Sequence, residues 1–189
     1  MKVSREQAAE NRARVLEVAG RLFRERGFDG IAVAEIMKGA GLTHGGFYNQ
    51  FGSKDHLAAE ACAQMLAGAA ARWKRHGEGD DPLGTLVNAY LTKRHRDAPG
   101  NGCAIASLAA ETARQPARVR AAFTEGLNDF IDILSTYVAG RSAAARRERA
   151  LATLSGMLGA MVLARAVNDP ALSTEILEAG AKTFGRAAG

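Results

Sequence analysis

The stretch that decides the fold is Val33-Ala-Glu-Ile-Met-Lys-Gly-Ala-Gly-Leu-Thr-His-Gly-Gly-Phe-Tyr-Asn-Gln-Phe51. Its first half places apolar residues on one face of a short helix, and Gly41 then interrupts that helix. Thr43 is a candidate N-cap for a second short helix that ends near Asn49. Two short helices joined by a tight turn are the pattern of a helix-turn-helix. Neither is stable alone, so neighbouring apolar side chains must pack them. The candidates for this packing are Phe23, Val33, Ile36, Leu42, Phe47 and Phe51.

Helical periodicity extends over the rest of the chain, and strand alternation is almost absent. Ser4, followed three residues later by Gln7, has the pattern of a capping box and opens a helix that Gly27 ends. Gly52 and Ser53 form a break and a cap before a long helix over 54–76. Further helices are expected near 83–91, 104–114, 116–137, 142–166 and 171–187. The sequence therefore predicts an all-α protein of about nine helices.

The second short helix leaves an unusual set of residues facing outward. Two adjacent glycines cost about 1 kcal/mol each relative to alanine in a helix, but they let the backbone approach a surface closely. Asparagine and histidine side chains can bond base edges, whereas hydroxyl groups suit phosphate oxygens. Ser53 and Lys54 begin the next helix, whose positive end favours a phosphate. The outward set is Thr43, His44, Gly45, Gly46, Tyr48, Asn49 and Gln50.

This pattern alone leaves an alternative open. Helix-turn-helix shapes occur in all-helical proteins that never meet DNA, so a helical adaptor without a DNA role fits the same short helices. Such an adaptor would bind DNA weakly and without sequence preference. The glycine-rich, polar outer face favours the DNA-binding interpretation.

The run Gly27-Phe-Asp-Gly-Ile-Ala-Val-Ala-Glu-Ile36, together with Ala40 to Leu57, resembles the DNA-binding domain of TetR-family transcriptional regulators. The most specific part is the frame Gly-x-x-Tyr-x-x-Phe-x-x-Lys, formed here by Gly45, Tyr48, Phe51 and Lys54. The resemblance covers residues 9–69, with the helix-turn-helix motif at about 32–51. A weaker resemblance links 102–111, Pro116 and 119–123 to one subgroup of the family's regulatory domains.

The resemblance implies a homodimer that binds a palindromic double-stranded DNA operator and usually represses transcription. Residues 70–189 would then form the ligand-binding and dimerisation domain, and a small-molecule inducer would release the DNA. By position, His44, Gly45, Gly46, Asn49 and Gln50 lie where the family contacts bases. Thr43, Tyr48 and Lys54 lie where it holds phosphate. Two residues depart from the pattern: Ala32 replaces the usual Ser or Thr cap, and Ala34 stands where a basic residue is common.

The larger C-terminal part offers candidate residues for dimerisation and for ligand binding. Apolar stripes on the last two helices could form half of a four-helix dimer interface, or could fill the core of a monomer. The interface candidates are Leu151, Leu154, Leu158, Met161, Val162, Leu172 and Ile176. The helices that line the family's cavity carry pocket candidates, although each one taken alone is more often a core residue than a ligand contact. These are Met65, Trp73, Tyr90, Cys103, Phe123 and Phe130.

Cys103 supports an alternative mode of regulation. It follows the flexible 99–102 segment and lies near a predicted helix start, where the helix dipole favours a reactive thiolate. Some members of the family sense oxidants or electrophiles through cysteine, and a repressor that acts through Cys103 is therefore a second hypothesis. A small buried residue is the simpler interpretation. Cys62 lies on an inner helical face and is expected to be inert.

Composition excludes several classes of protein. The 189 residues, 47% hydrophobic and 24% charged, suit one domain or one with a small appendage, and the net charge of +5 is compatible with a polyanionic partner. The polar N-terminus does not match a signal peptide, and 156–164 is too short to span a bilayer, so a cytoplasmic protein with no membrane partner is expected. Neither hydrolase and phosphate-loop motifs nor metal-ligand spacings are present. We therefore expect no enzyme, no cofactor and no metal.

Overall fold

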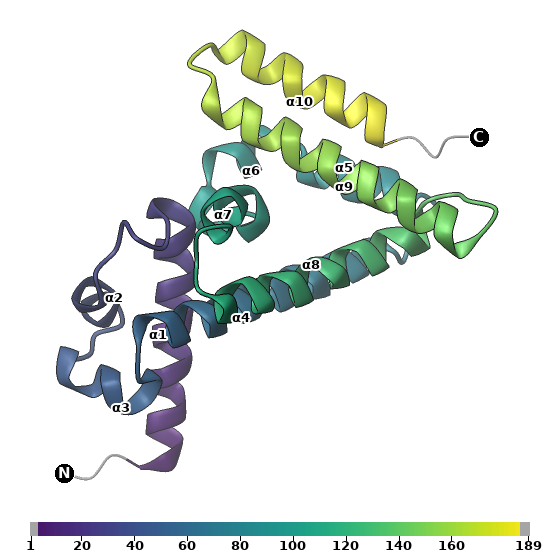
Figure 1. Ribbon diagram of the computed structural model, residues 1–189. Helices are drawn as coiled ribbons and strands as arrows, with labels where there is room; N and C mark the ends of the chain where they lie inside the picture. Colours follow the sequence, from purple (N-terminus) through teal and green to yellow (C-terminus); the bar gives the residue numbers. More distant parts are fainter. Residues whose placement is uncertain (1–3, 186–189) are drawn as a thin grey trace.

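The computed structural model describes residues 4–185. Within that range it contains ten α-helices, two short 3-10 helices and no strand, which confirms the all-α prediction (Figure 1). The unpredicted helix is α6 (Lys93–Asp97), because its sequence Lys-Arg-His-Arg-Asp offers no apolar periodicity. The last helix, α10, spans Pro170–Phe184, and residues 186 and 187 of the expected range lie outside the described residues.

The N-terminal helices gather at one end of the molecule (Figure 1). They are α1 (Arg5–Arg26), α2 (Val33–Gly39), the 3-10 helix η1 (His44–Gly46) and α3 (Phe47–Phe51). Ser4 caps α1, since its hydroxyl accepts a hydrogen bond from the Gln7 N–H at 3.0 Å. The breaks predicted at Gly27, Gly41 and Gly52 are confirmed by their positive φ angles of 80°, 70° and 72°.

Helix α4 (Lys54–His76) leads from this group into the larger part of the chain and is continuous through residues 69 and 70. It packs along α8 (Ala117–Tyr137), and the two helices run side by side over most of their length (Figure 1). Gly126 permits this close approach, because a Cβ there would lie 2.5 Å from Leu66. Leu57, Leu66 and Phe130 are fully buried in this core.

The remaining elements complete the C-terminal part. They are α5 (Pro82–Tyr90), α6, the 3-10 helix η2 (Pro99–Asn101), α7 (Ala104–Thr112) and α9 (Ala143–Ala166), which pairs with α10. Figure 1 shows α9 and α10 forming one outer layer of the molecule. None of the helices between residues 4 and 185 combines the length and hydropathy that crossing a membrane requires.

Candidate nucleic-acid interface and small-molecule cavity

The second short helix is anchored by two phenylalanines. Phe47 and Phe51 are 0% and 4% exposed, and their rings stack with centroids 5.7 Å apart. The Arg12 guanidinium of α1 lies 4.7 Å above the Phe51 ring and also pairs with Glu60 of α4. Because these contacts join α1, α3 and α4, the orientation of α3 is fixed by packing on its inner side.

The outer side of the same segment is open to solvent. Thr43, His44, Gly45 and Asn49 are exposed, and Tyr48 is 60% exposed. The Tyr48 ring meets His44 and Phe47 edge to face, at centroid distances of 5.9 and 5.2 Å. These contacts orient an exposed aromatic side chain that no interior packing requires. Contact of these residues with DNA stays a prediction.

Three other candidates are less exposed than the outward pattern suggests. Gly46, Gln50 and Lys54 are half-buried. The Gln50 amide folds back along its helix, since its nitrogen lies 3.9 Å from the position that a Cβ on Gly46 would occupy. Its oxygen is buried and has no hydrogen-bond partner among residues 4–185. Gln50 would therefore have to change rotamer to reach a base.

Gly45 is not required by the protein's own structure. A Cβ at this position would have no heavy atom within 4 Å, and the φ angle is not positive. Alanine would therefore fit here in the free protein, with less cost to local helical structure. The remaining physical role for a glycine at this point is close approach of the backbone to an external surface.

The start of the helix-turn-helix differs in detail from the expectation. Ala32 indeed gives α2 no side-chain cap, but the Glu35 carboxylate accepts a hydrogen bond from the Ala32 N–H at 3.1 Å. Arg26 donates to the same carboxylate at 3.1 Å. Thr43 lies at the N-cap position of η1 without a side-chain bond, and the segment is a 3-10 turn followed by an α-helix to Phe51.

One basic residue near this surface was missed by sequence reasoning. Arg14 of α1 donates to the Ala40 carbonyl at 3.5 Å, which places its guanidinium beside the turn between α2 and η1. Arg14 and Ala40 are 26 positions apart. No local pattern could have joined them, because the contact arises only when α1 crosses behind the motif.

The C-terminal part contains a cavity of about 180 Å³ between α4, α5 and the segment before α7. Three of the predicted pocket residues, Trp73, Tyr90 and Cys103, line it. Sequence reasoning missed the polar residues of its wall. They are Arg72, His76, His95, Asn101 and Gly102, and the apolar lining consists of Ala69, Leu86 and Ala89.

The other three predicted pocket residues do not line this cavity. Phe130 is fully buried behind Trp73, with the two rings edge to face at 4.6 Å. Phe123 is partly buried against the core, and Met65 lines a separate hollow between α1 and α4. Periodicity identified the inner faces of these helices correctly, but it does not distinguish a cavity wall from the core behind it.

His95 lies in the cavity wall, and its two hydrogen bonds define which ring nitrogen carries the proton. Its Nε2 accepts a hydrogen bond from the Cys103 N–H at 3.0 Å, so Nδ1 carries the proton and donates to the Tyr90 carbonyl at 2.7 Å. The bond from the Cys103 N–H requires the neutral imidazole, because a protonated Nε2 cannot accept. Burial lowers the pKa of His95, and repulsion by Arg165 and Arg72 acts in the same direction.

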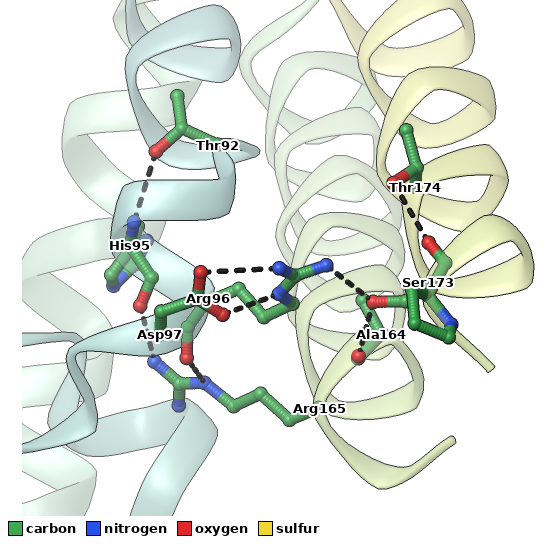
Figure 2. A network of polar contacts seen from close by, with 9 residues as sticks. Thr92, His95, Arg96, Asp97, Ala164, Arg165, Ser173 and Thr174 are labelled. Atoms are coloured by element: carbon green, nitrogen blue, oxygen red, sulfur yellow. Dashed lines mark hydrogen bonds and ion pairs between the residues drawn. The ribbon is translucent and has the colours of Figure 1, made fainter. Parts of the chain in front are cut away.

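A polar network joins this wall to the outer layer of helices (Figure 2). The Arg165 guanidinium, on α9, donates to the carbonyls of His95 and Arg96 at 2.9 and 3.1 Å. Arg96 pairs with Asp97 at 2.6 Å and donates to the Ser173 hydroxyl of α10 at 2.8 Å. The short helix α6 is therefore attached to both α9 and α10.

Two hydrogen bonds join the other side of the cavity region to α1. Arg24 donates from Nε to the Gly100 carbonyl at 2.7 Å, within η2. The Glu111 carboxylate of α7 accepts from the Phe28 N–H at 2.8 Å, directly after α1. The segment 100–111 thus lies between the cavity and the helix that supports the candidate DNA-binding surface.

The two cysteines have different surroundings. Cys103 is the N-cap residue of α7, as its sequence position suggested, and is 7% exposed. Cys62 is fully buried on the inner face of α4, and burial raises its pKa to about 12. Among the described residues, no group of histidine, cysteine and acidic side chains could hold a metal ion.

The candidate dimer residues fall into two groups. Leu151, Val162 and Leu172 are 42–44% exposed on α9 and α10, and Leu158 and Ile176 are half-buried. Leu154 and Met161 instead face the chain's own core, with 3% and 0% exposure. Leu163, which sequence reasoning omitted, is 56% exposed. The exposed apolar residues lie on the outer layer of Figure 1.

Comparisons with known proteins agree with this architecture. Residues 15–61 match the family profile "Bacterial regulatory proteins, tetR family". The HTH-type transcriptional regulator UidR of Escherichia coli (strain K12) is 28% identical over 110 residues, which cover 58% of this chain and 56% of UidR. The chain thus spans about half the length of the curated relatives it matches.

Two solved structures extend the similarity to almost the whole chain. The reduced form of E. coli NemR is 24% identical, covers 93% of this chain and 95% of its own, and has a TM-score of 0.77. AibR, solved in complex with isovaleryl coenzyme A and operator DNA, is 16% identical with a TM-score of 0.65. It covers 93% of this chain and 98% of its own. At these identities the structural similarity establishes the fold.

Proposed function

Since residues 15–61 match the profile of the tetR family of bacterial regulatory proteins, we propose that the chain belongs to this family and is a sequence-specific, DNA-binding transcriptional regulator that acts in the cytoplasm. The observation that carries this proposal is the surface at 43–49, where exposed polar side chains and two glycines face outward from a helix that Phe47 and Phe51 fix. His44 and Asn49 would bond base edges, and Thr43, Tyr48 and Lys54 would hold phosphates. In this proposal the domain boundary lies at residues 69–70, within α4.

The same proposal includes a homodimer. A helix-turn-helix dimer reads two half-sites about one DNA turn apart, roughly 34–36 Å, and its symmetry selects palindromic operators. The exposed apolar residues Leu151, Val162, Leu163 and Leu172 on α9 and α10 support a four-helix interface between two copies. Leu158 and Ile176 would pack at its margin, whereas Leu154 and Met161 stabilise the individual protomer.

Release of the DNA by a small molecule is the regulatory part of the proposal. The cavity near Trp73 and Tyr90 lies beside hydrogen bonds that lead to α1 and to α9. A ligand that binds more tightly to one arrangement of these helices would shift the dimer towards it. AibR, which has a similar fold and was solved with isovaleryl coenzyme A and operator DNA, supports the combination of a small-molecule ligand and DNA as partners.

A thiol-dependent repressor is the second candidate, and one observation favours it. Cys103 lines the cavity and is the N-cap residue of α7, so its thiol lies at a helix N-terminus beside the space that a ligand would enter. An electrophile small enough to enter would meet this thiol and would disturb the bond between Cys103 and His95. In this case Cys103→Ser would abolish release of DNA by the electrophile, while release by a non-reactive ligand would persist.

Selection of bound duplexes from a random DNA library tests the main proposal. The expected product is a palindromic sequence whose half-sites are one helical turn apart. Recovery of duplexes without a common sequence would support the adaptor alternative instead, because non-specific binding depends on phosphate charge alone.

A further inference from the structure

The wall of the cavity between α4, α5 and the segment before α7 includes one residue whose polar group has no partner in the described part of the chain. Tyr90 lines the cavity, and the Tyr90 hydroxyl is buried and has no hydrogen-bond partner within residues 4–185. The Tyr90 side chain as a whole is only 5% exposed. An unpaired buried hydroxyl is costly, so a site that keeps one is suited to a ligand that pairs with it. The side chain of Cys103 interacts with this hydroxyl, but a thiol is only a weak hydrogen-bonding group.

Tyr90 also keeps a proton that it can donate. Burial, reinforced by Cys103, raises its pKa well above the usual range, so the phenol stays protonated at neutral pH. The neighbouring His95 already uses both ring nitrogens within the protein. A hydrogen-bond acceptor on a ligand would therefore pair with the free O–H of Tyr90.

The charges around the cavity are of one sign. Arg72 and His76 line it, and no aspartate or glutamate does. Arg24 and Arg72 repel one another, which adds to burial in lowering the pKa of Arg24. Among the described residues Arg72 takes part in no ion pair. An anionic ligand would gain attraction from Arg72 and relieve this repulsion.

The remaining walls set the size and the apolar character of the ligand. Trp73, Leu86 and Ala69 supply an apolar side, and the volume is about 180 Å³. Cavities for drug-sized ligands are larger, at about 300–1,000 Å³. A coenzyme A thioester therefore exceeds this cavity, whereas a single aromatic ring or short branched chain with one carboxylate fits it.

We propose that this cavity binds a small organic monocarboxylate, with its carboxylate between the Tyr90 hydroxyl and the Arg72 guanidinium and its apolar body against Trp73. The inference rests on the proposed role of the cavity as the effector site, and it adds the chemical class of the effector. Tyr90 donates its O–H to a carboxylate oxygen and Arg72 supplies the opposite charge, and the two parts can be tested separately.

The only tryptophan of the chain lies in the cavity wall, so its fluorescence reports binding directly. The probes are benzoate and isovalerate, each titrated beside its uncharged amide. The expected result is a saturable change with each carboxylate and affinity at least tenfold lower for each amide. Arg72→Gln should reduce carboxylate affinity to that of the amide, whereas Arg75→Gln, exposed on the same helix, should leave it unchanged.

Tyr90→Phe should weaken carboxylate binding about tenfold, as expected for a hydrogen bond to a charged group. It should not lower the melting temperature of the free protein, because the lost hydroxyl had no partner. No change with either carboxylate, or equal affinity for acid and amide, would overturn the inference. A parallel titration of operator DNA separates the two proposals: carboxylate binding without any effect on DNA would refute the effector role alone.

Discussion

The Nε atom of Arg24 and the carbonyl oxygen of Gly100 lie 2.7 Å apart. Arg24 belongs to α1. Nearer the N-terminus of the same helix, Arg12 packs on the Phe51 ring of the second helix of the motif. Gly100 belongs to the segment whose next residues, Asn101 to Cys103, wall the cavity. This hydrogen bond is therefore a direct link between the proposed effector site and the proposed DNA-binding surface.

Breaking this link should uncouple the two sites. We expect Arg24→Gln to keep DNA affinity within about threefold, because the 43–49 surface is unchanged, and to reduce the loss of affinity that benzoate causes. The measurement is the DNA dissociation constant with and without benzoate. Arg21→Gln removes an exposed arginine of the same helix and is the matched control. An equal effect of benzoate in both variants would show that Arg24 carries no coupling.

Gly45→Ala should affect stability and DNA binding in opposite directions. The open space around Gly45 predicts a melting temperature that does not fall, while the added methyl group should weaken DNA binding by keeping the backbone from the duplex. Gly79→Ala is the control, since that loop glycine also has open space and lies outside the motif. If Gly45→Ala binds the selected operator as tightly as the unmodified protein, the backbone does not approach the DNA there.

Lys54 and Asn49 should affect DNA recognition differently. Lys54→Ala is expected to weaken binding to all duplexes and to lower the slope of log K against log salt by about 1 for each protomer. Lys74→Ala, near the far end of the same helix, should leave that slope unchanged. An unaltered slope in Lys54→Ala would remove Lys54 from the set of phosphate contacts.

For Asn49→Ala the expected result is a change in the ranking of operator variants, by roughly 1–3 kcal/mol at one base position. Competition between duplexes that differ at single positions measures this. If all relative affinities stay the same, Asn49 does not read a base.

The pKa of His95 gives a pH dependence of stability. Its folded-state pKa lies below the unfolded value of 6.5, chiefly because of burial, so the unfolded chain binds the proton more tightly. Stability is then fully present above about pH 6.5 and falls as the pH decreases towards the folded-state pKa. Arg165 and Arg72 enlarge this effect, since both repel the protonated ring.

Melting temperatures of the unmodified protein and of His95→Gln, measured from pH 7.5 to 5.5, test this dependence. The variant should lose less stability over that range, even if it starts from a lower value. His56→Gln, an exposed histidine, provides the baseline. Parallel curves for the unmodified protein and His95→Gln would contradict the assignment of a neutral, buried His95.

The exposed apolar residues of α9 and α10 predict the oligomeric state. Val162→Glu places a charge in the proposed interface and should produce a monomer, because an unpaired buried charge is strongly unfavourable. Light scattering coupled to size-exclusion chromatography measures the mass, with Ala71→Glu on the exposed side of α4 as the control. A Val162→Glu protein that remains dimeric would place the interface elsewhere.

Local patterns predicted the parts of the fold that local chemistry determines. Gly27, Gly41 and Gly52 have the positive φ angles expected of breaks, and Ser53 caps α4 through the His56 N–H at 3.2 Å. Helix α6 was missed because its stability comes from Arg165 and Ser173, which lie far away in the chain. The helix propensity of the five residues of α6 gives no indication of these distant partners.

The candidate sites also differ in how far they depend on local sequence and on contacts between distant residues. The 43–49 surface could be predicted because its residues are consecutive and their exposure follows from the burial of Phe47 and Phe51. The cavity could be predicted only in part. Arg72 and His95 join Tyr90 and Cys103 at the cavity through tertiary packing, and their polarity gave no reason to place them in its wall.

The most direct test of the central claim is a titration of the purified protein with the intergenic DNA beside its own gene, at two salt concentrations and against a shuffled duplex of equal composition. The account predicts tighter binding to the intergenic duplex at both concentrations, with the preference lost in a variant that combines His44→Ala and Asn49→Ala. Equal affinity for the two duplexes, or an unchanged preference in that variant, would contradict it.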